Sequence, residues 1–197
     1  MESRSLQTGR ESKTGAVVAD CHGRTPAGDP PDASDNPAHA PLDQARAHHR
    51  AGRLAEARTL YQELLAAQPG NAEVLYAMAV LAQQAGRLDI TIQHLKQAVS
   101  HRPDFVAAHI YLGNSHLAMN QRREAVRHYR RAVELEPGHV GAHLNLARLF
   151  QQTGRFEQAA AHFETALALD PELAQAHDSL RRLLQDRGRA EAALKRQ

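Results

Sequence analysis

The sequence predicts an all-α fold in which antiparallel helical hairpins stack one on another, and three observations support this. The first is a composition in which hydrophobic residues make up 42%, aromatic residues only 4%, and Trp is absent, which suits closely packed helices with small contact residues. The second is a proline ladder with a 34-residue spacing, formed by Pro69, Pro103, Pro137 and Pro171. The third is a ladder of the same spacing formed by Gly52, Gly86, Asn120, Gly154 and Gly188.

The N-terminal stretch has a different character from the rest of the chain. Residues 23–32 are rich in Gly, Pro and Asp, and residues 1–37 hold few large apolar side chains that could offset the entropy of ordering. We therefore expect residues 1–37 to form a disordered tail, either a tether or a leader without a specific role. The ordered domain is expected over residues 38–197.

The two ladders predict where each helix begins and ends. Gly and Asn tolerate the positive φ that a tight turn after a helix requires, and proline ends one helix and helps to start the next unit. The first helix of each unit is expected near residues 42–51, 72–85, 106–119, 140–153 and 174–187. The second helices are expected near residues 55–67, 89–101, 123–135, 157–169 and 190–196.

Further ladders of the same period predict the core. Large apolar side chains recur at Tyr61, Leu95, Tyr129 and Phe163. Small or modest side chains recur at Ala57, Thr91, Ala125 and Ala159, and again at Leu64, Ala98, Ala132 and Ala166. Small residues let two helices approach closely, and each large side chain contributes roughly 1.5–3 kcal/mol when fully buried. Because one hairpin cannot cover its own apolar face, the units must stack.

This pattern resembles the tetratricopeptide repeat, whose signature is Trp-x2-Leu-Gly-x2-Tyr, then Ala-x3-Phe, then Pro. The third unit carries the best match, with Leu112, Gly113, Ala125, Tyr129, Ala132 and Pro137 in order. The resemblance implies a right-handed superhelical solenoid with four full repeats and a partial fifth. These repeats would span residues 38–71, 72–105, 106–139, 140–173 and 174–197.

In that family, the first helices line a concave groove that binds peptides or partner proteins. The resemblance therefore implies a binding surface made of Arg46, Tyr76, Val80, Ile110, Asn114, Leu144, Asn145, Arg148 and Arg182. Apolar members could bury a partner's side chains, amides offer both a donor and an acceptor, and arginines could bind carboxylates in bidentate fashion. The expected ligand is a peptide or protein, with some acidic character.

Other functions remain as alternatives. The chain is similar to repeat modules that precede bacterial sulfotransferase and protein O-glycosyltransferase domains, so it could be a substrate-recognition arm that works beside a transferase. Asn114 and Asn145 form part of an asparagine ladder of the kind seen in such glycosyltransferases. Self-association through the C-terminal end is a third hypothesis. Solenoid ends need a polar cap, and the fifth unit is only partial, so an incompletely capped end could pair with a second copy.

Several chemistries are not expected. The formal net charge of +2 gives no field that would recruit nucleic acid or membrane, and no apolar run is long enough to span a bilayer. One cysteine, Cys21, permits neither an internal disulfide nor a thiolate zinc site. The recurring His109, His143 and His177 are expected to pack between repeats rather than share a metal. We therefore expect a non-catalytic, cytoplasmic protein without cofactor or metal.

Overall fold

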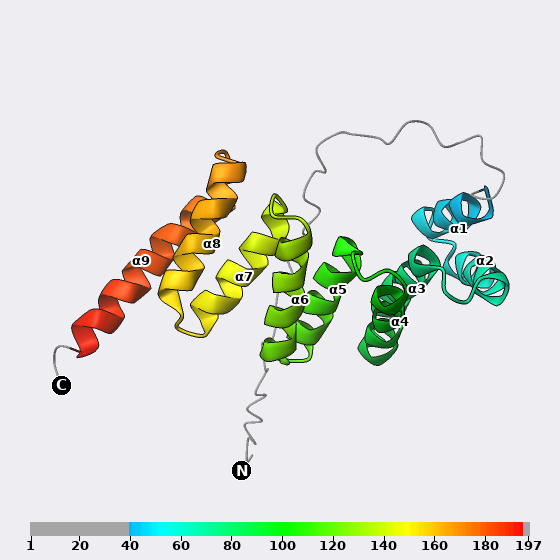
Figure 1. Ribbon diagram of the computed structural model, residues 1–197, viewed down its shortest axis with the longest axis horizontal. Helices are drawn as coiled ribbons and strands as arrows, with labels where there is room; N and C mark the ends of the chain where they lie inside the picture. The colour runs from blue at the N-terminus through cyan, green and yellow to red at the C-terminus, as the bar shows by residue number, and fades with distance from the viewer. Residues whose placement is uncertain (1–39, 195–197) are drawn as a thin grey trace, which may run out of the picture.

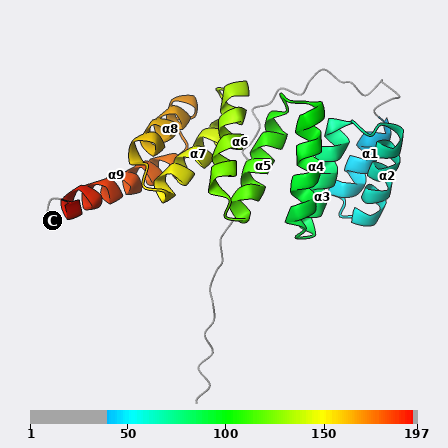
Figure 2. The same ribbon diagram turned by 60° about the horizontal axis from the view of Figure 1, so that its bottom comes forward.

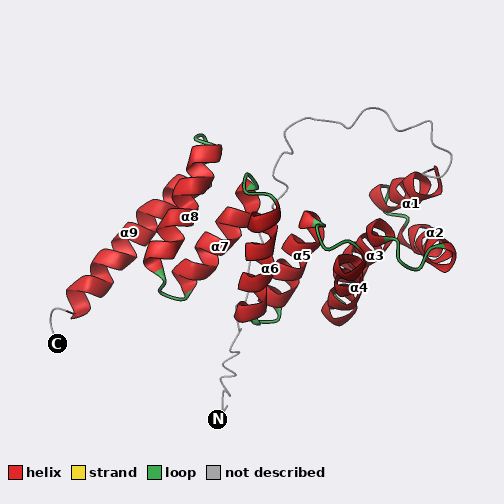
Figure 3. Cartoon of the chain, in the orientation of Figure 1, coloured by secondary structure: helices red, strands yellow, loops and turns green. Residues whose placement is uncertain are grey.

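The computed structural model describes residues 40–194, and every regular element within this range is a helix (Figure 3). The predicted tail over residues 1–37 lies outside the described residues. Nine helices lie within residues 40–194, and their bounds are α1 (Ala40–Arg50), α2 (Leu54–Ala67), α3 (Ala72–Gln84), α4 (Leu88–His101), α5 (Val106–Ala118), α6 (Arg122–Leu135), α7 (Val140–Gln152), α8 (Phe156–Leu169) and α9 (Ala174–Leu194).

The helices follow one another along a curved row, as Figures 1 and 2 show from two sides. Helices α1 and α2, α3 and α4, α5 and α6, and α7 and α8 form antiparallel hairpins. The second helix of each hairpin also contacts the first helix of the next one. The structure therefore confirms an all-α repeat fold made of stacked hairpins.

The predicted turns form where the Gly and Asn ladder places them. The backbone φ is +74° at Gly52, +72° at Gly86 and Gly154, and +58° at Asn120. Each of these residues lies between the first and second helix of its hairpin, in the left-handed conformation that Gly and Asn adopt at least cost. Each of α2, α4, α6 and α8 ends two residues before a ladder proline, as the sequence predicts.

The predicted core ladder is buried. The side chains of Tyr61, Leu95, Tyr129 and Phe163 are at most 1% exposed, and the small residues beside them are fully enclosed. The buried apolar residues form clusters that each include both helices of a hairpin and part of the next one. The residues of α3, α5 and α7 that are not buried are half-buried almost throughout, so these first helices keep a partly accessible surface.

The fifth unit differs from the prediction, because α9 continues through Gly188 without the expected turn. In the four hairpins, a small buried residue of the first helix faces the second helix, at Ala45, Ala79, Gly113 and Ala147. Arg181 occupies the corresponding position of α9 and is exposed. Residues 174–194 form a single long helix, so the predicted turn at Gly188 is wrong. A long charged side chain at Arg181 does not suit the close helix contact that a small residue allows in the four hairpins.

No helix among residues 40–194 combines the length and the apolar character needed to cross a bilayer.

Candidate partner-binding face

Side chains of successive first helices contact one another along one side of the stack, and we call the surface formed by α1, α3, α5 and α7 the first-helix face. Polar side chains bridge neighbouring helices on this face. Nη2 of Arg46 on α1 donates a 2.8 Å hydrogen bond to Glu73 on α3, and Nδ2 of Asn145 on α7 donates a 3.4 Å bond to Asn114 on α5. Predicted site residues from different repeats are therefore brought together.

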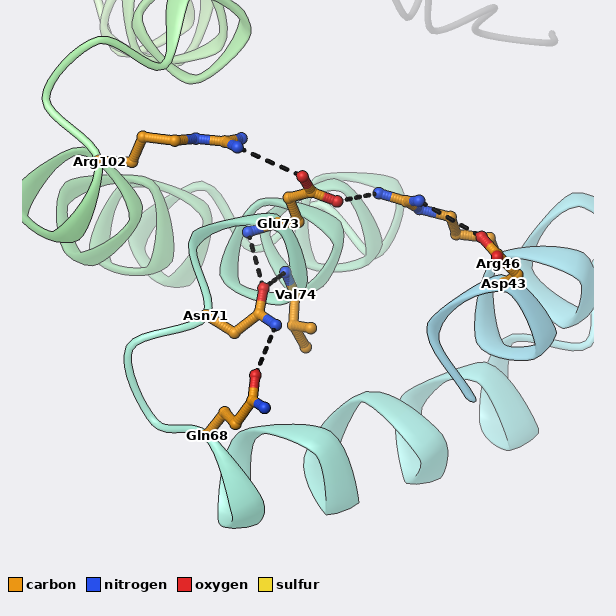
Figure 4. A network of polar contacts seen from close by, with 7 residues as sticks. All are labelled: Asp43, Arg46, Gln68, Asn71, Glu73, Val74 and Arg102. Carbon is orange, nitrogen blue, oxygen red and sulfur yellow. Dashed lines mark hydrogen bonds and ion pairs between the residues drawn. The ribbon is translucent and has the colours of Figure 1, made fainter. Parts of the chain in front are cut away.

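A charged network occupies the N-terminal end of the first-helix face (Figure 4). The two carboxylate oxygens of Glu73 accept hydrogen bonds from Arg46 and from Nη1 of Arg102, the latter at 3.3 Å. Asp43 lies 3.5 Å from Arg46 on the opposite side of the guanidinium. Glu73 is held at this point because the side chain of Asn71 caps α3, accepting hydrogen bonds from the backbone N–H groups of Glu73 and Val74.

The environment of Glu73 favours its charged form. Burial alone would raise the pKa of its carboxyl group, but the hydrogen bonds and positive charges of Arg46 and Arg102 outweigh this and lower the pKa. The carboxylate is therefore ionised at neutral pH and keeps both guanidinium groups in fixed positions. Each guanidinium retains N–H groups beyond those that bind Glu73.

An aromatic cluster adjoins the charged network. The ring of Tyr76 lies 5.2 Å from the ring of Phe105 and 5.3 Å from that of Tyr111, measured between centroids. The guanidinium of Arg102 covers the Phe105 ring at 3.5 Å, a favourable cation–π geometry. Burial raises the pKa of Tyr76, so its hydroxyl stays protonated. The cluster is half-buried, which leaves part of its apolar surface available for contact.

An amide pair, Asn114 and Asn145, lies further along the face. Oδ1 of Asn114 accepts a 2.6 Å hydrogen bond from the hydroxyl of Tyr129 and also the bond from Asn145. Tyr129 belongs to the second helix α6, yet its hydroxyl reaches the first-helix face beside Gly113. Both amide side chains are half-buried.

The predicted site residues differ in how far they are accessible. Val80, Ile110 and Arg148 are half-buried in α3, α5 and α7, and Arg182 is exposed on α9. Leu144 is only 6% exposed and belongs to the core cluster of the last two hairpins. It therefore supports the face from beneath and presents almost no surface to a partner.

The recurring histidines form hydrogen bonds within and beside their hairpins. Nε2 of His109 lies 3.1 Å from the carbonyl of Pro103, and its Nδ1 lies 3.2 Å from Nδ1 of His128. His143 repeats this arrangement with His162 and Pro137, at 3.0 Å in both contacts. No group of three His, Cys, Asp or Glu side chains in the described part of the chain is arranged to hold a metal ion.

Three features of this region were not found by sequence reasoning. Arg102 lies in the connection between α4 and α5, outside the first helices, so the repeat pattern gives it no place on the face. The pattern places Tyr129 in the core, but its hydroxyl contact crosses from α6 to α5. His94, His128 and His162 form a further 34-residue ladder. His128 and His162 follow His109 and His143 by 19 residues in both cases, and this constant offset is the sequence signal for the histidine pairs.

Comparison with known proteins adds to these observations. Family models described as tetratricopeptide repeat match residues 48–89 and 112–174. The crystal structure of MamA has a TM-score of 0.70 to this chain at 21% identity, covering 79% of this chain and 85% of that one. YrrB, described as a TPR protein with an unusual peptide-binding site, gives 0.62 at 18% identity, covering 73% and 74% respectively. The APC/C heterotetramer Cut9–Hcn1 gives 0.65 at 19% identity, covering 73% of this chain and 29% of that one. A comparison with curated protein sequences finds no match.

Proposed function

Because the chain belongs to the tetratricopeptide repeat family, we propose that it is a non-catalytic interaction scaffold whose first-helix face is a concave groove for a peptide or partner protein. The observation that carries this proposal is the amide pair. The two hydrogen bonds of the pair use Oδ1 of Asn114 and Nδ2 of Asn145, so neither bond uses Nδ2 of Asn114 or Oδ1 of Asn145, and both side chains are half-buried. Polar groups held in this way are suited to a ligand.

The chemistry of the face favours a ligand with some acidic character. The guanidinium groups of Arg46, Arg102 and Arg148 lie on or beside the first helices, and Glu73 and Asp43 offset only part of their charge. An incoming carboxylate could use the guanidinium N–H groups that do not bind Glu73. The aromatic cluster around Tyr76 supplies an apolar contact beside these charges. We therefore propose an extended segment that combines acidic and apolar side chains.

Affinity capture from native lysate tests this proposal. The wild type is compared with the triple variant Tyr76→Ala, Asn114→Ala, Arg148→Ala. A matched control carries Gln93→Ala, Arg123→Ala and Glu157→Ala, which alter three exposed positions on second helices. Far-UV circular dichroism and thermal melting establish that both variants fold. Loss of captured partners in the first variant only is expected, and equal capture by all three proteins would reject the first-helix face as the binding surface.

A transferase-associated role is the alternative proposal. The observation that favours it is the contact between Asn114 and Asn145, which corresponds to part of an asparagine ladder. In this role the chain would present a protein substrate to a separate catalytic protein. Its gene should then lie beside a glycosyltransferase or sulfotransferase gene, and addition of the chain should lower the KM of that enzyme for its protein substrate. An unchanged KM would reject this role.

Self-association at α9 and a cytoplasmic location also remain proposals. Leu184 on α9 is 56% exposed, and α9 has no second helix of its own within residues 40–194. If copies associate there, light scattering will show a mass that rises with concentration, and Leu184→Glu will abolish the rise. Cell fractionation tests the location directly.

A further inference from the structure

We infer that Tyr129 is a positioning residue that fixes the amide pair so that it binds the main chain of an extended peptide in one direction. This inference rests on the proposed function and adds to it the chemical group recognised and the polarity of the bound segment. Tyr129 is 1% exposed and cannot itself touch a ligand, so we infer that it acts through Asn114, which accepts its hydroxyl hydrogen bond.

The position of Tyr129 depends on a glycine. A Cβ atom added to Gly113 would lie 2.4 Å from Cε1 of the Tyr129 ring, far inside van der Waals contact. The absence of a side chain at Gly113 therefore lets the ring pass α5 and bring its hydroxyl to Asn114. Gly113, which leaves room for the ring, directly precedes Asn114, which accepts the hydrogen bond from the Tyr129 hydroxyl.

The first hairpin provides an internal comparison. Tyr61 occupies the position equivalent to Tyr129, but the chain has Ala45 and Arg46 where the third hairpin has Gly113 and Asn114. The hydroxyl of Tyr61 is buried and finds no hydrogen-bond partner in the described part of the chain. A buried tyrosine in this position therefore does not by itself provide the contact to the face. The combination of Gly, Asn and Tyr in the third hairpin does.

The hydrogen bonds determine which amide atoms are available. Oδ1 of Asn114 already accepts from Tyr129 and Asn145, so its two lone pairs are used. Asn114 therefore offers the N–H groups of Nδ2, and Asn145 offers its Oδ1. Together they present a donor and an acceptor, as one residue of a neighbouring β-strand does. Without the tyrosine hydroxyl, the Asn114 side-chain amide could rotate so that its oxygen and nitrogen exchange places. The donor at Asn114 and the acceptor at Asn145 would then no longer be fixed.

The same arrangement sets the direction of the peptide. A residue of an extended chain directs its N–H and its C=O to the same side, and the N–H comes first in the chain. Its N–H must meet Oδ1 of Asn145 on α7, and its C=O must meet Nδ2 of Asn114 on α5. The bound segment therefore runs from α7 towards α5. Its C-terminal part then points towards the charged network at Arg46, Glu73 and Arg102.

The test begins with a phage library of random twelve-residue peptides selected on the full chain. Peptides are retained when the Tyr76→Ala, Asn114→Ala, Arg148→Ala variant fails to bind them. Affinities are then measured for the wild type, Tyr129→Phe and the matched control Tyr61→Phe, which removes a hydroxyl that makes no hydrogen bond. Both variants should fold, since Phe163 occupies the equivalent position of the fourth hairpin. Tyr129→Phe should weaken binding about fivefold to tenfold, and Tyr61→Phe should change it less than about twofold.

Two further measurements distinguish a role of Tyr129 in positioning the amide pair from a purely structural role in the core. N-methylation of the peptide residue that contacts the amide pair should weaken binding to the wild type but cause little further loss with Tyr129→Phe, because both changes disrupt the same two-point contact with the coupled amides. A photoreactive group at the peptide N-terminus should label α7, and one at the C-terminus should label α3. Equal affinity of wild type and Tyr129→Phe, or labelling in the reverse order, would overturn the inference and leave the proposed function intact. Failure to select any face-dependent peptide would overturn both.

Discussion

Nδ1 of His109 lies 3.2 Å from Nδ1 of His128, and these two buried rings join α5 to α6. The neighbouring contacts determine which ring carries which proton. Nε2–H of His109 donates to the carbonyl of Pro103, so its Nδ1 must accept from Nδ1–H of His128. Nε2 of His128 is then left as the acceptor that faces Arg127. The pair is complete only when both rings are neutral.

This pair makes stability sensitive to acid. Burial lowers the pKa of His128 to about 4, helped by the positive charge of Arg127 and by His109 and His116, while Glu124 opposes the shift. Burial likewise lowers the pKa of His109, and Arg131 adds to the effect. The unfolded chain then binds more protons than the folded one below pH 6.5. We expect His128 alone to reduce the free energy of unfolding by about 2 kcal/mol between pH 7 and pH 5.

Chemical denaturation at several pH values checks this expectation. The control is the double variant His109→Leu, His128→Leu, because the chain has Leu75 and Leu60 in the equivalent positions of earlier hairpins. Its stability should fall less steeply between pH 7 and pH 5 than that of the wild type. Equal slopes for the two proteins would show that the histidine pair does not control the acid response.

Gly188 and Gly86 should respond in opposite ways to alanine. Gly188 lies inside α9, and an added Cβ there meets no atom within 4 Å, whereas Gly86 has a φ of +72°. Gly188→Ala should raise stability by up to about 1 kcal/mol, and Gly86→Ala should lower it by about the same amount. Thermal melting measures both. A loss of stability in Gly188→Ala would indicate that Gly188 adopts the positive-φ turn that the sequence predicts, and would contradict a continuous α9.

Gly113→Ala should destabilise the third hairpin. The added methyl group collides with the buried ring of Tyr129, and the expected cost is about 1–3 kcal/mol. Gly138→Ala is the matched control, since its Cβ meets nothing within 4 Å and it does not have a positive φ. Denaturant midpoints should therefore fall only for Gly113→Ala. Equal midpoints would show that the ring has room to move aside.

Asn71→Ala should weaken the start of α3. The side chain of Asn71 caps two backbone N–H groups, and loss of such a cap costs typically about 1 kcal/mol. Arg87 occupies the same position at the start of α4 but makes no side-chain cap bond, so Arg87→Ala should cost much less. Urea unfolding of both variants gives the comparison, and equal losses would contradict the assigned cap.

The repeat fold could be predicted from the sequence because its determinants are local and recur. Gly86 and Asn120 differ in type but share the ability to take a positive φ, and Tyr61 and Phe163 share their size and burial. The end of the stack could not be predicted in the same way. The spacing of Gly188 indicates a turn, but the conformation depends on whether a second helix can pack against Arg181.

The arrangement of the candidate site was only partly predictable. The ladder places Arg46, Asn114 and Arg148 at equivalent positions, but their contacts depend on residues elsewhere in the sequence. Glu73 binds Arg102 across 29 residues, and Tyr129 reaches Asn114 from the opposite helix. Such contacts depend on the stacking of hairpins and on which helix admits a ring. A periodic pattern predicts that the hairpins stack, but it does not specify which side chains meet across the stack.

Hydrogen–deuterium exchange of the full chain, with and without a selected peptide, tests the central claim most directly. The account predicts that the peptide slows exchange in α3, α5 and α7, while exchange in α4, α6 and α8 changes little. Protection concentrated on the second helices, or confined to α9, would contradict the assignment of the first-helix face as the binding surface.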